Sequence, residues 1–160
     1  MYTAAVLTIS DSASQGKRQD VSGPTIVKEL ERAGFQVTAT AIVADEQDQI
    51  QKELVSCCGK ARLVVTVGGT GIAARDVTPE ATMAVAERLV PGIPERIRGM
   101  ASTPFAALSR GLSAVRGQSL IINLPGSPKA ALESVQTVLA LLPHALELLG
   151  GKTEHETSRP

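Results

Sequence analysis

Hydrophobic and polar positions follow two different periods along this chain, and the two periods alternate. Residues 63–67 (LVVTV) form a short run rich in β-branched side chains, which is typical of a strand covered on both faces. Residues 35–43 place an apolar side chain at every second position, which predicts a strand. Two further apolar runs, residues 4–9 and 119–124, are also expected to be strands.

Helical patterns separate the expected strands. The first helix starts near residue 22, carries apolar side chains on one face and stops at Gly34. Three more helices are expected, with Asp45, Thr78 and Ser127 as N-cap residues, and the last has a kink at Pro143. In the proline- and glycine-rich residues 89–118, only two short helices are expected, at 93–100 and 105–108. The alternation predicts an α/β fold of three layers, α/β/α, in which helices cover both faces of a mostly parallel sheet.

The chemistry of the chain is concentrated in the turn after the strand at 63–67. Gly68, Gly69, Thr70 and Gly71 allow positive φ angles and a close approach of a ligand to the main chain. Consecutive N–H groups in such a turn form a concave anion site, and Asp76 follows as a free carboxylate. The combination predicts a site for a magnesium-bound nucleotide, because the carboxylate can hold a metal that the phosphates also bind.

Other interpretations of this turn stay open. The P-loop string G-x-x-x-x-G-K-[ST] does not occur in the sequence. The loose dinucleotide pattern G-x-G-x-x-A fits residues 69–74, but the expected helix starts later, at Thr78 and Pro79. A strand-to-helix turn without a ligand is the remaining alternative.

Polar residues also follow the other expected strands. The carboxyl ends of parallel strands meet at one edge of a sheet, where open α/β sheets bind ligands. Ser10, Asp11 and Ser12 belong either to such a site or to a solvated loop with local turn bonds. Asp45 is either a helix cap or a site residue. Lys129 lies in the first turn of a helix, where a cation is unfavourable, so it is either solvated or close to an anionic ligand.

Composition narrows the class of protein. The 160 residues predict one domain, residues 1–150, followed by a polar tail at 151–160 that is expected to be disordered. Sixteen basic and sixteen acidic residues give no net charge, which argues against a nucleic-acid partner. No apolar run is judged long enough for a membrane span, and the start lacks a basic leader, so we expect a cytoplasmic protein without a membrane partner. The adjacent Cys57 and Cys58 match no zinc spacing and are expected to be small buried or half-buried thiols.

Three motifs together resemble the molybdenum-cofactor-biosynthesis (MoCF) domain family, which includes MogA, MoaB and the G domain of gephyrin. They are GGTG at 68–71, RDVTPEAT at 75–82 and NLPGSPKA at 123–130. The resemblance extends from TISDS at 8–12 through DEQ at 45–47 to the last helix, which is nearly the whole chain. It implies a nucleotidyltransferase, a molybdopterin adenylyltransferase that converts Mg-ATP and molybdopterin into adenylyl-molybdopterin and pyrophosphate.

The resemblance also implies roles for individual residues. Asp45 and Asp76 match the catalytic aspartates of the family and would hold Mg²⁺, and residues 68–71 match its glycine loop, which would bind the nucleotide phosphates. The residues expected to bind the pterin are Ser10, Asp11, Ser12, Thr78, Pro79, Glu80, Pro125, Gly126, Ser127 and Pro128. Family members are typically trimers, which implies a homotrimer that could hand its product to a molybdate-insertion protein.

Three other functions remain compatible with the resemblance. One is molybdate insertion, which similar domains perform within two-domain proteins. Another is a MoaB-type paralogue that binds molybdopterin or nucleotide with little turnover. The third is a trimeric scaffold domain.

Overall fold

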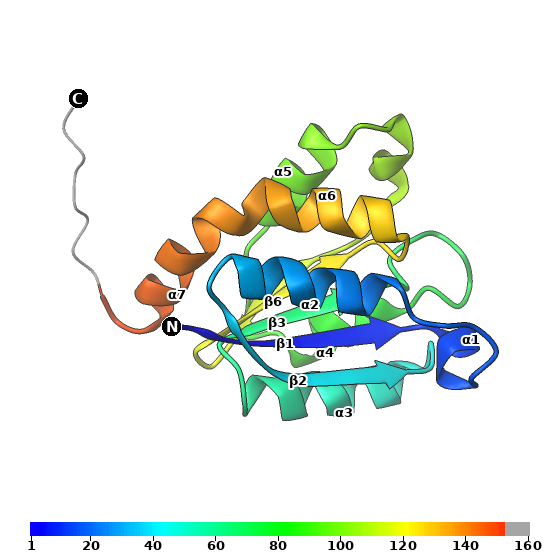
Figure 1. Ribbon diagram of the computed structural model, residues 1–160, viewed down its shortest axis with the longest axis horizontal. Helices are drawn as coiled ribbons and strands as arrows, with labels where there is room; N and C mark the ends of the chain where they lie inside the picture. The colour runs from blue at the N-terminus through cyan, green and yellow to red at the C-terminus, as the bar shows by residue number, and fades with distance from the viewer. Residues whose placement is uncertain (153–160) are drawn as a thin grey trace.

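The computed structural model describes residues 1–152, which form a six-stranded sheet with helices on both faces (Figure 1). The strands are β1 (Thr3–Ile9), β2 (Gln36–Val43), β3 (Leu63–Val67), β4 (Arg88–Leu89), β5 (Ser113–Arg116) and β6 (Ser119–Leu124). Their order in the sheet is β2-β1-β3-β6-β5-β4. The first four in this order are parallel to one another, and β5 and β4 are antiparallel to their neighbours. Residues 153–160, most of the expected tail, lie outside the described residues.

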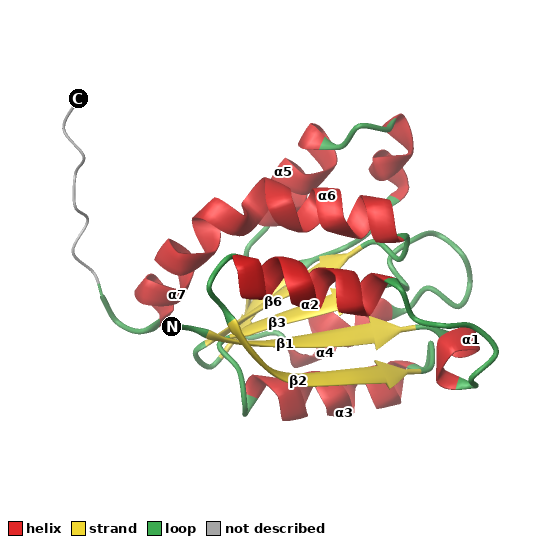
Figure 2. Ribbon diagram, viewed as in Figure 1, coloured by secondary structure: helices red, strands yellow, loops and turns green. Residues whose placement is uncertain are grey.

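Helices cover the two faces of the sheet and confirm the predicted three layers (Figure 2). One face is covered by α2 (Ser22–Arg32), α5 (Gly92–Met100), α6 (Pro128–Val138) and α7 (Leu142–Leu149), and the other by α3 (Gln47–Cys58) and α4 (Thr78–Val85). Successive side chains of a strand point to opposite faces, so Val6 joins the first apolar cluster and Leu7 the second. Because apolar side chains pack on both faces of the sheet, the strands and the loops at their carboxyl ends are held in fixed positions.

Strand β2 lies at the edge of the sheet and shows the predicted period of two. Its residues alternate between exposed and half-buried along the whole strand, with Val37, Ala39 and Val43 on the half-buried side. An edge strand can bury only the side chains that face the core, so its pattern is visible in the sequence.

Residues 85–118 differ most from the prediction. Helix α4 ends at Val85, and Arg88–Leu89 pairs with β5 as an antiparallel strand. Strands β4 and β5 were not predicted, because two and four residues are too short to display a period. The short helices at 93–100 and 105–108 are confirmed as α5 and the 3₁₀ helix η1 (Pro104–Leu108).

The last helical region runs from α6 through a 3₁₀ turn, η2 (Leu139–Leu141), into α7, so the break lies just before Pro143. Ser127 caps α6 as predicted, and its Oγ accepts a hydrogen bond from the Ala130 N–H at 3.3 Å. By length and apolar composition alone, Pro128–Leu149 is a stretch that could cross a membrane, which corrects the expectation from the sequence. Its apolar side chains include Val138, Leu142 and Leu146, which are buried in the core.

Candidate active site

The carboxyl ends of β1, β3 and β6 lie side by side because these strands are parallel neighbours. From β1 the chain first moves outward to β2 and then returns to β3 on the other side of β1. Such a reversal of strand order opens a crevice at the carboxyl edge of a sheet. The loops that leave the edge here are the ones that carried the polar and glycine-rich motifs of the sequence.

The glycine loop after β3 has a backbone that excludes side chains. Gly68 and Gly69 have φ angles of +105° and +66°, in the region that favours glycine. A Cβ at Gly69 would overlap the Thr78 hydroxyl and lie 3.1 Å from Oδ1 of Asp45. A Cβ at Gly126, in the loop after β6, would lie 3.4 Å from Cα of Gly68. The two loops thus approach each other backbone to backbone.

The N–H groups at the tip of this loop are available to a ligand. Within residues 1–152, the N–H groups of Gly69, Thr70 and Gly71 donate no hydrogen bond to a backbone or side-chain acceptor. By contrast, Gly68 N donates to Leu124 O at 3.0 Å. Unpaired successive N–H groups in a turn attract anions, and phosphate is a frequent occupant. The tip of the loop therefore has the free N–H groups that the predicted anion site requires.

Thr78 stabilises the glycine loop and is not the N-cap that the sequence predicted. Helix α4 has Val77 in the N-cap position, and Thr78 and Pro79 are its first two residues. The fully buried Thr78 hydroxyl instead donates to the Gly68 carbonyl at 2.9 Å. This hydrogen bond fixes the orientation of the peptide that follows β3.

Arg110 fastens the other end of the glycine loop. Its guanidinium donates to the carbonyls of Gly71 at 2.7 Å and Asp76 at 2.6 Å, and it forms an ion pair with Glu80. The Arg110 side chain lowers the pKa of the Glu80 carboxyl through this contact. Sequence analysis could not select Arg110 among the arginines of residues 89–118, because its partners lie some 30 positions earlier in the chain.

A buried polar cluster holds the strand ends beneath the loop. The Asn123 amide donates to the hydroxyls of Thr66 at 3.0 Å and Thr82 at 2.9 Å, which links β6, β3 and α4. Its Oδ1 accepts from the Leu112 N–H at 3.0 Å. Each of the three side chains is at most 4% exposed. A satisfied buried network of this kind fixes the relative position of the elements that it joins.

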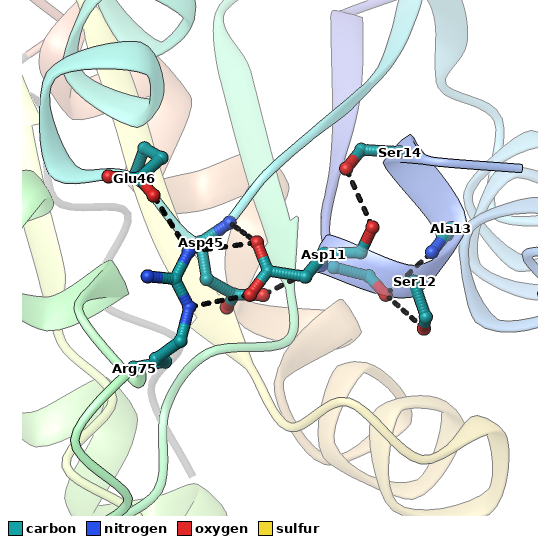
Figure 3. A network of polar contacts seen from close by, with 8 residues as sticks. Asp11, Ser12, Ala13, Ser14, Asp45, Glu46 and Arg75 are labelled. Atoms are coloured by element: carbon teal, nitrogen blue, oxygen red, sulfur yellow. Dashed lines mark hydrogen bonds and ion pairs between the residues drawn. The ribbon is translucent and has the colours of Figure 1, made fainter. Parts of the chain in front are cut away.

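Asp11 and Asp45 exchange hydrogen bonds, and Asp11 also pairs with Arg75 (Figure 3). Asp11 N donates to Oδ2 of Asp45 at 2.8 Å, and Asp45 N donates to Oδ1 of Asp11 at 3.0 Å. Arg75 contacts Asp11 at 2.6 Å and Glu46 at 2.8 Å. Asp45 therefore is not a helix cap, since Glu46 has the N-cap position of α3 and makes no side-chain cap bond. The two reciprocal hydrogen bonds, which we call the Asp11–Asp45 ring, orient Asp45 toward the glycine loop.

The electrostatics of the two carboxylates differ. The hydrogen bond from Arg75 holds the pKa of Asp11 below its usual value. Burial raises the pKa of Asp45, and the negative charges of Asp11 and Asp76 add to this effect. An ionised Asp45 is thus short of positive charge and favours a cation as its partner.

Asp76 lies beside Gly71, within the same loop. Its Oδ2 accepts from the Ala73 N–H at 3.0 Å, and a Cβ at Gly71 would lie 2.8 Å from the same oxygen. The absence of a side chain at Gly71 therefore leaves the space that the Asp76 carboxylate occupies. The loop that carries the free N–H groups thus also carries the Asp76 carboxylate.

Two cavities of about 430 and 450 Å³ meet at the glycine loop, and both are lined by Gly69, Asp76, Gly126 and Ser127. The first, which we call the polar cavity, is also lined by Ser10, Arg18, Asp20 and Asp45. The second, the apolar cavity, is also lined by Ile97, Phe105 and Leu108. The site therefore offers a charged chamber and an apolar chamber with a shared boundary.

A larger cavity of about 830 Å³ lies in the groove between α2 and the edge strand β2. It is lined by Val27, Lys28 and Ile42 among others, and by neither Asp45 nor the glycine loop. We place the site at the two smaller cavities, because the free N–H groups and both aspartates converge there.

The structure sorts the predicted site residues into two groups. Those that line the cavities are Ser10, Asp45, Gly68, Gly69, Thr70, Gly71, Asp76, Pro125, Gly126, Ser127 and Pro128. Those that line neither cavity are Asp11, Ser12, Thr78, Pro79 and Glu80. The second group supports the first, mainly through the Asp11–Asp45 ring, the Thr78 hydroxyl and the Glu80–Arg110 pair. Lys129 lines neither cavity.

The residues present can contribute only part of a metal coordination shell. Within residues 1–152, no group of three or more His, Cys, Asp or Glu side chains is placed to hold a metal. Asp45 and Asp76 face the polar cavity, whereas Asp11 is already tied to Arg75. Mg²⁺ is commonly bound by one or two carboxylates together with substrate phosphates and water. The site thus fits a magnesium ion that arrives with a phosphate ligand.

The fold and the site together define a doubly wound α/β domain with a glycine loop at its switch point. A family model described as "Probable molybdopterin binding domain" matches residues 5–144, and the chain belongs to this molybdenum-cofactor-biosynthesis domain family. A molybdopterin adenylyltransferase of Helicobacter pylori J99 is 42% identical over 152 residues, which cover 91% of this chain and 86% of that protein.

Further relatives extend the comparison. The molybdenum cofactor synthesis protein cinnamon of Drosophila melanogaster is 47% identical over 154 residues, but the matched region is 26% of that protein. The crystal structure of the molybdopterin biosynthesis enzyme MoaB from Thermus thermophilus aligns with a TM-score of 0.90 and 47% identity, over 95% of this chain and 98% of MoaB. A structure of MogA aligns with a TM-score of 0.87 and 37% identity, over 92% and 99% of the two chains.

Proposed function

We propose that this protein is a molybdopterin adenylyltransferase, which transfers the adenylyl group of Mg-ATP to molybdopterin. The observation that carries the proposal is the meeting of two cavities at free loop N–H groups and Asp76. A reaction between two phosphate-bearing substrates needs such a shared point. The adenylyltransferase from Helicobacter pylori, with 42% identity over most of both chains, supports the same choice.

The two cavities suit different parts of the substrates. The polar cavity, with Asp45, Asp76 and Ser10, takes the triphosphate and its magnesium ion. The apolar cavity, with Ile97, Phe105 and Leu108, takes the flat pterin ring, which brings the phosphate of molybdopterin toward Gly69 and Ser127. Both reacting groups then face the N–H groups of the glycine loop.

In the proposed reaction, an oxygen of the molybdopterin phosphate attacks the α-phosphorus of ATP. A new phosphorus–oxygen bond forms while the bond to the bridging oxygen of the β-phosphate breaks, and pyrophosphate leaves. The attacking phosphate is already ionised at neutral pH, so the step needs no general base. The N–H groups of Gly69, Thr70 and Gly71 orient the phosphates and stabilise the negative charge that develops on them.

Asp45 and Asp76 would hold Mg²⁺ against the phosphates. When bound, the ion would neutralise charge on the phosphates and on the pyrophosphate leaving group. The raised pKa of Asp45 is consistent with this role, because a bound cation would supply the positive charge that the buried carboxylate lacks.

The test is pyrophosphate release from Mg-ATP with and without purified molybdopterin, with the adenylylated pterin followed by mass. We expect release only when molybdopterin is present, and at least a roughly hundredfold loss on Asp76→Ala, as for removal of other groups that stabilise transition-state charge. An Asp76→Ala protein with full activity would overturn the proposed role of this carboxylate.

A MoaB-type binding paralogue with little turnover is the second candidate, and we test it because the chain aligns with a MoaB structure at 47% identity. It predicts that molybdopterin binds the wild-type protein while no adenylylated product forms under any nucleotide supply. The same assay therefore separates the two candidates.

We also propose that the protein is a cytoplasmic homotrimer that passes its product to a molybdate-insertion protein. Exposed apolar side chains support self-association, among them Ile72, Leu89 and Met100, which are 69%, 45% and 61% exposed. Light scattering on the purified protein measures the mass directly.

A further inference from the structure

The loop between α1 (Asp11–Ser14) and α2 is anchored beside the polar cavity, at the tips of β1 and β2 (Figure 1). At its first part, Arg18 N donates to the Ser12 carbonyl at 3.3 Å. At its end, Asp20 accepts from the Thr8 hydroxyl at 2.7 Å and from Gly23 N at 3.0 Å. The loop is therefore held to α1 at Arg18 and to β1 and α2 at Asp20.

Arg18 is the cation that this loop presents to the polar cavity. The cavity is lined by three carboxylates, Asp20, Asp45 and Asp76, and Arg18 is the one Lys or Arg in its lining. Within the described residues, Arg18 forms no ion pair and no side-chain hydrogen bond. By contrast, Arg75 and Arg110 are engaged with carboxylates and carbonyls of the chain.

A polyphosphate in this cavity requires more positive charge than one divalent cation provides. The carboxylates repel it, and the free N–H groups of the glycine loop reach only the phosphates nearest to them. A guanidinium matches two phosphate oxygens at once and keeps its charge at any working pH. Arg18 has that chemistry, and no acidic residue of the described chain forms an ion pair with it.

We propose that Arg18 is a phosphate-binding residue that contacts the terminal phosphates of the nucleotide, the part that leaves as pyrophosphate. This inference rests on the proposed function, because it assumes that the polar cavity holds the triphosphate. It adds Arg18 to the residues of the site. Arg18 lies outside the glycine loop and is not one of the two aspartates, so the sequence motifs did not identify it.

The experiment compares the binding of Mg-ATP, Mg-ADP and AMP to the full-length wild-type protein and to Arg18→Ala, by calorimetry. Loss of a charge-assisted hydrogen-bonding group weakens binding by about tenfold. We expect this loss for ATP, a smaller one for ADP, and less than about a twofold change for AMP. Arg18→Lys should recover part of the affinity, since it restores the charge without the fork of donors.

Lys17→Ala is the matched control, because Lys17 is the exposed neighbouring cation and lines neither cavity. It should leave all three affinities unchanged, and equal melting temperatures would show that each variant is folded. Equal binding of ATP by wild type and Arg18→Ala would overturn the assignment of Arg18 alone. Equal weakening of ATP and AMP would also overturn it, since the contact would then not involve the terminal phosphates. A wild-type protein that binds no nucleotide would instead reject the proposed function.

Discussion

At the scale of single residues, Gly69 combines two constraints that can be separated by mutation. Its φ angle of +66° is unfavourable for any other residue, and a Cβ there would also overlap the Thr78 hydroxyl. Gly16 has a similar φ of +71°, but a Cβ there meets nothing within 4 Å. The pair therefore distinguishes backbone strain from steric conflict at the site.

We expect Gly16→Ala to lower the free energy of unfolding by about 1 kcal/mol. Gly69→Ala should cost about 2–4 kcal/mol, because displacement of Thr78 and Asp45 adds to the strain. It should also abolish nucleotide binding. Urea unfolding and calorimetry measure both quantities, and similar effects of the two substitutions would show that close packing at Gly69 is unimportant.

The sequence predicted those site residues that belong to a recognisable local motif. Three glycines within four positions and a following aspartate predicted the loop at 68–76, and the structure places Asp76 in both cavities. Arg18 and Arg110 have no such signature, because what defines them is a long-range partner or a cavity. Thr78 was misassigned as a helix cap for the same reason, since its hydroxyl donates to the distant Gly68 carbonyl. The residue pattern left Asp45 open between a helix cap and a site residue, because its carboxylate accepts from the distant Asp11 N–H.

At the scale of elements, Asn123 joins β6 to β3 and α4 in the interior. Asn123→Ala would leave the Leu112 N–H without its acceptor and would open a small cavity. We expect the free energy of unfolding to fall by about 2–4 kcal/mol. Thr25→Ala is the comparison, because it removes an exposed hydroxyl that bonds to the backbone one turn earlier, and it should cost less than about 0.5 kcal/mol. Equal losses in chemical denaturation would show that the buried cluster contributes little.

The strands differed in how clearly the sequence pattern predicted them. Strands β1, β3 and β6 are buried along their length, and β2 alternates, so each has a period or an apolar run. Strand β4 exists only through its antiparallel pairing with β5, which joins residues more than 20 positions apart. Strand β5 also pairs with β6 across a short hairpin, but its four residues are too few to display a period. Short non-local pairs carry no local pattern, and the fold class was predictable without them.

At the scale of the whole molecule, ion pairs at the site link stability to pH. Asp11 and Glu80 have pKa values below their usual 3.8 and 4.5, because Arg75 and Arg110 donate to them. The stability that these pairs contribute is fully present above those usual values, and it is lost as the pH falls through the lowered values. Asp45 acts in the opposite direction, because its raised pKa means that protonation relieves a cost of burial.

Arg75→Gln removes the cation that pairs with Asp11 and with Glu46. We expect the variant to be less stable than wild type at neutral pH, and the difference should shrink toward zero as the pH falls from about 5 to about 2. Urea unfolding across this pH range gives the difference directly. A difference that is the same at every pH would mean that Arg75 stabilises the fold by packing and not through the Asp11 charge.

The close packing around Gly68 and Gly69 has a consequence for how such a site can change over time. A Cβ at Gly68 would overlap the Ile9 carbonyl oxygen and a Cβ at Gly69 would overlap the Thr78 hydroxyl, so a side chain at either position would displace its neighbours. Adaptation to a different nucleotide or a modified pterin is then restricted to the margins of the two cavities, where Arg18 and Phe105 are exposed and unencumbered. Libraries that randomise these marginal positions should yield altered substrate preference, whereas libraries at the glycines should yield mainly inactive protein.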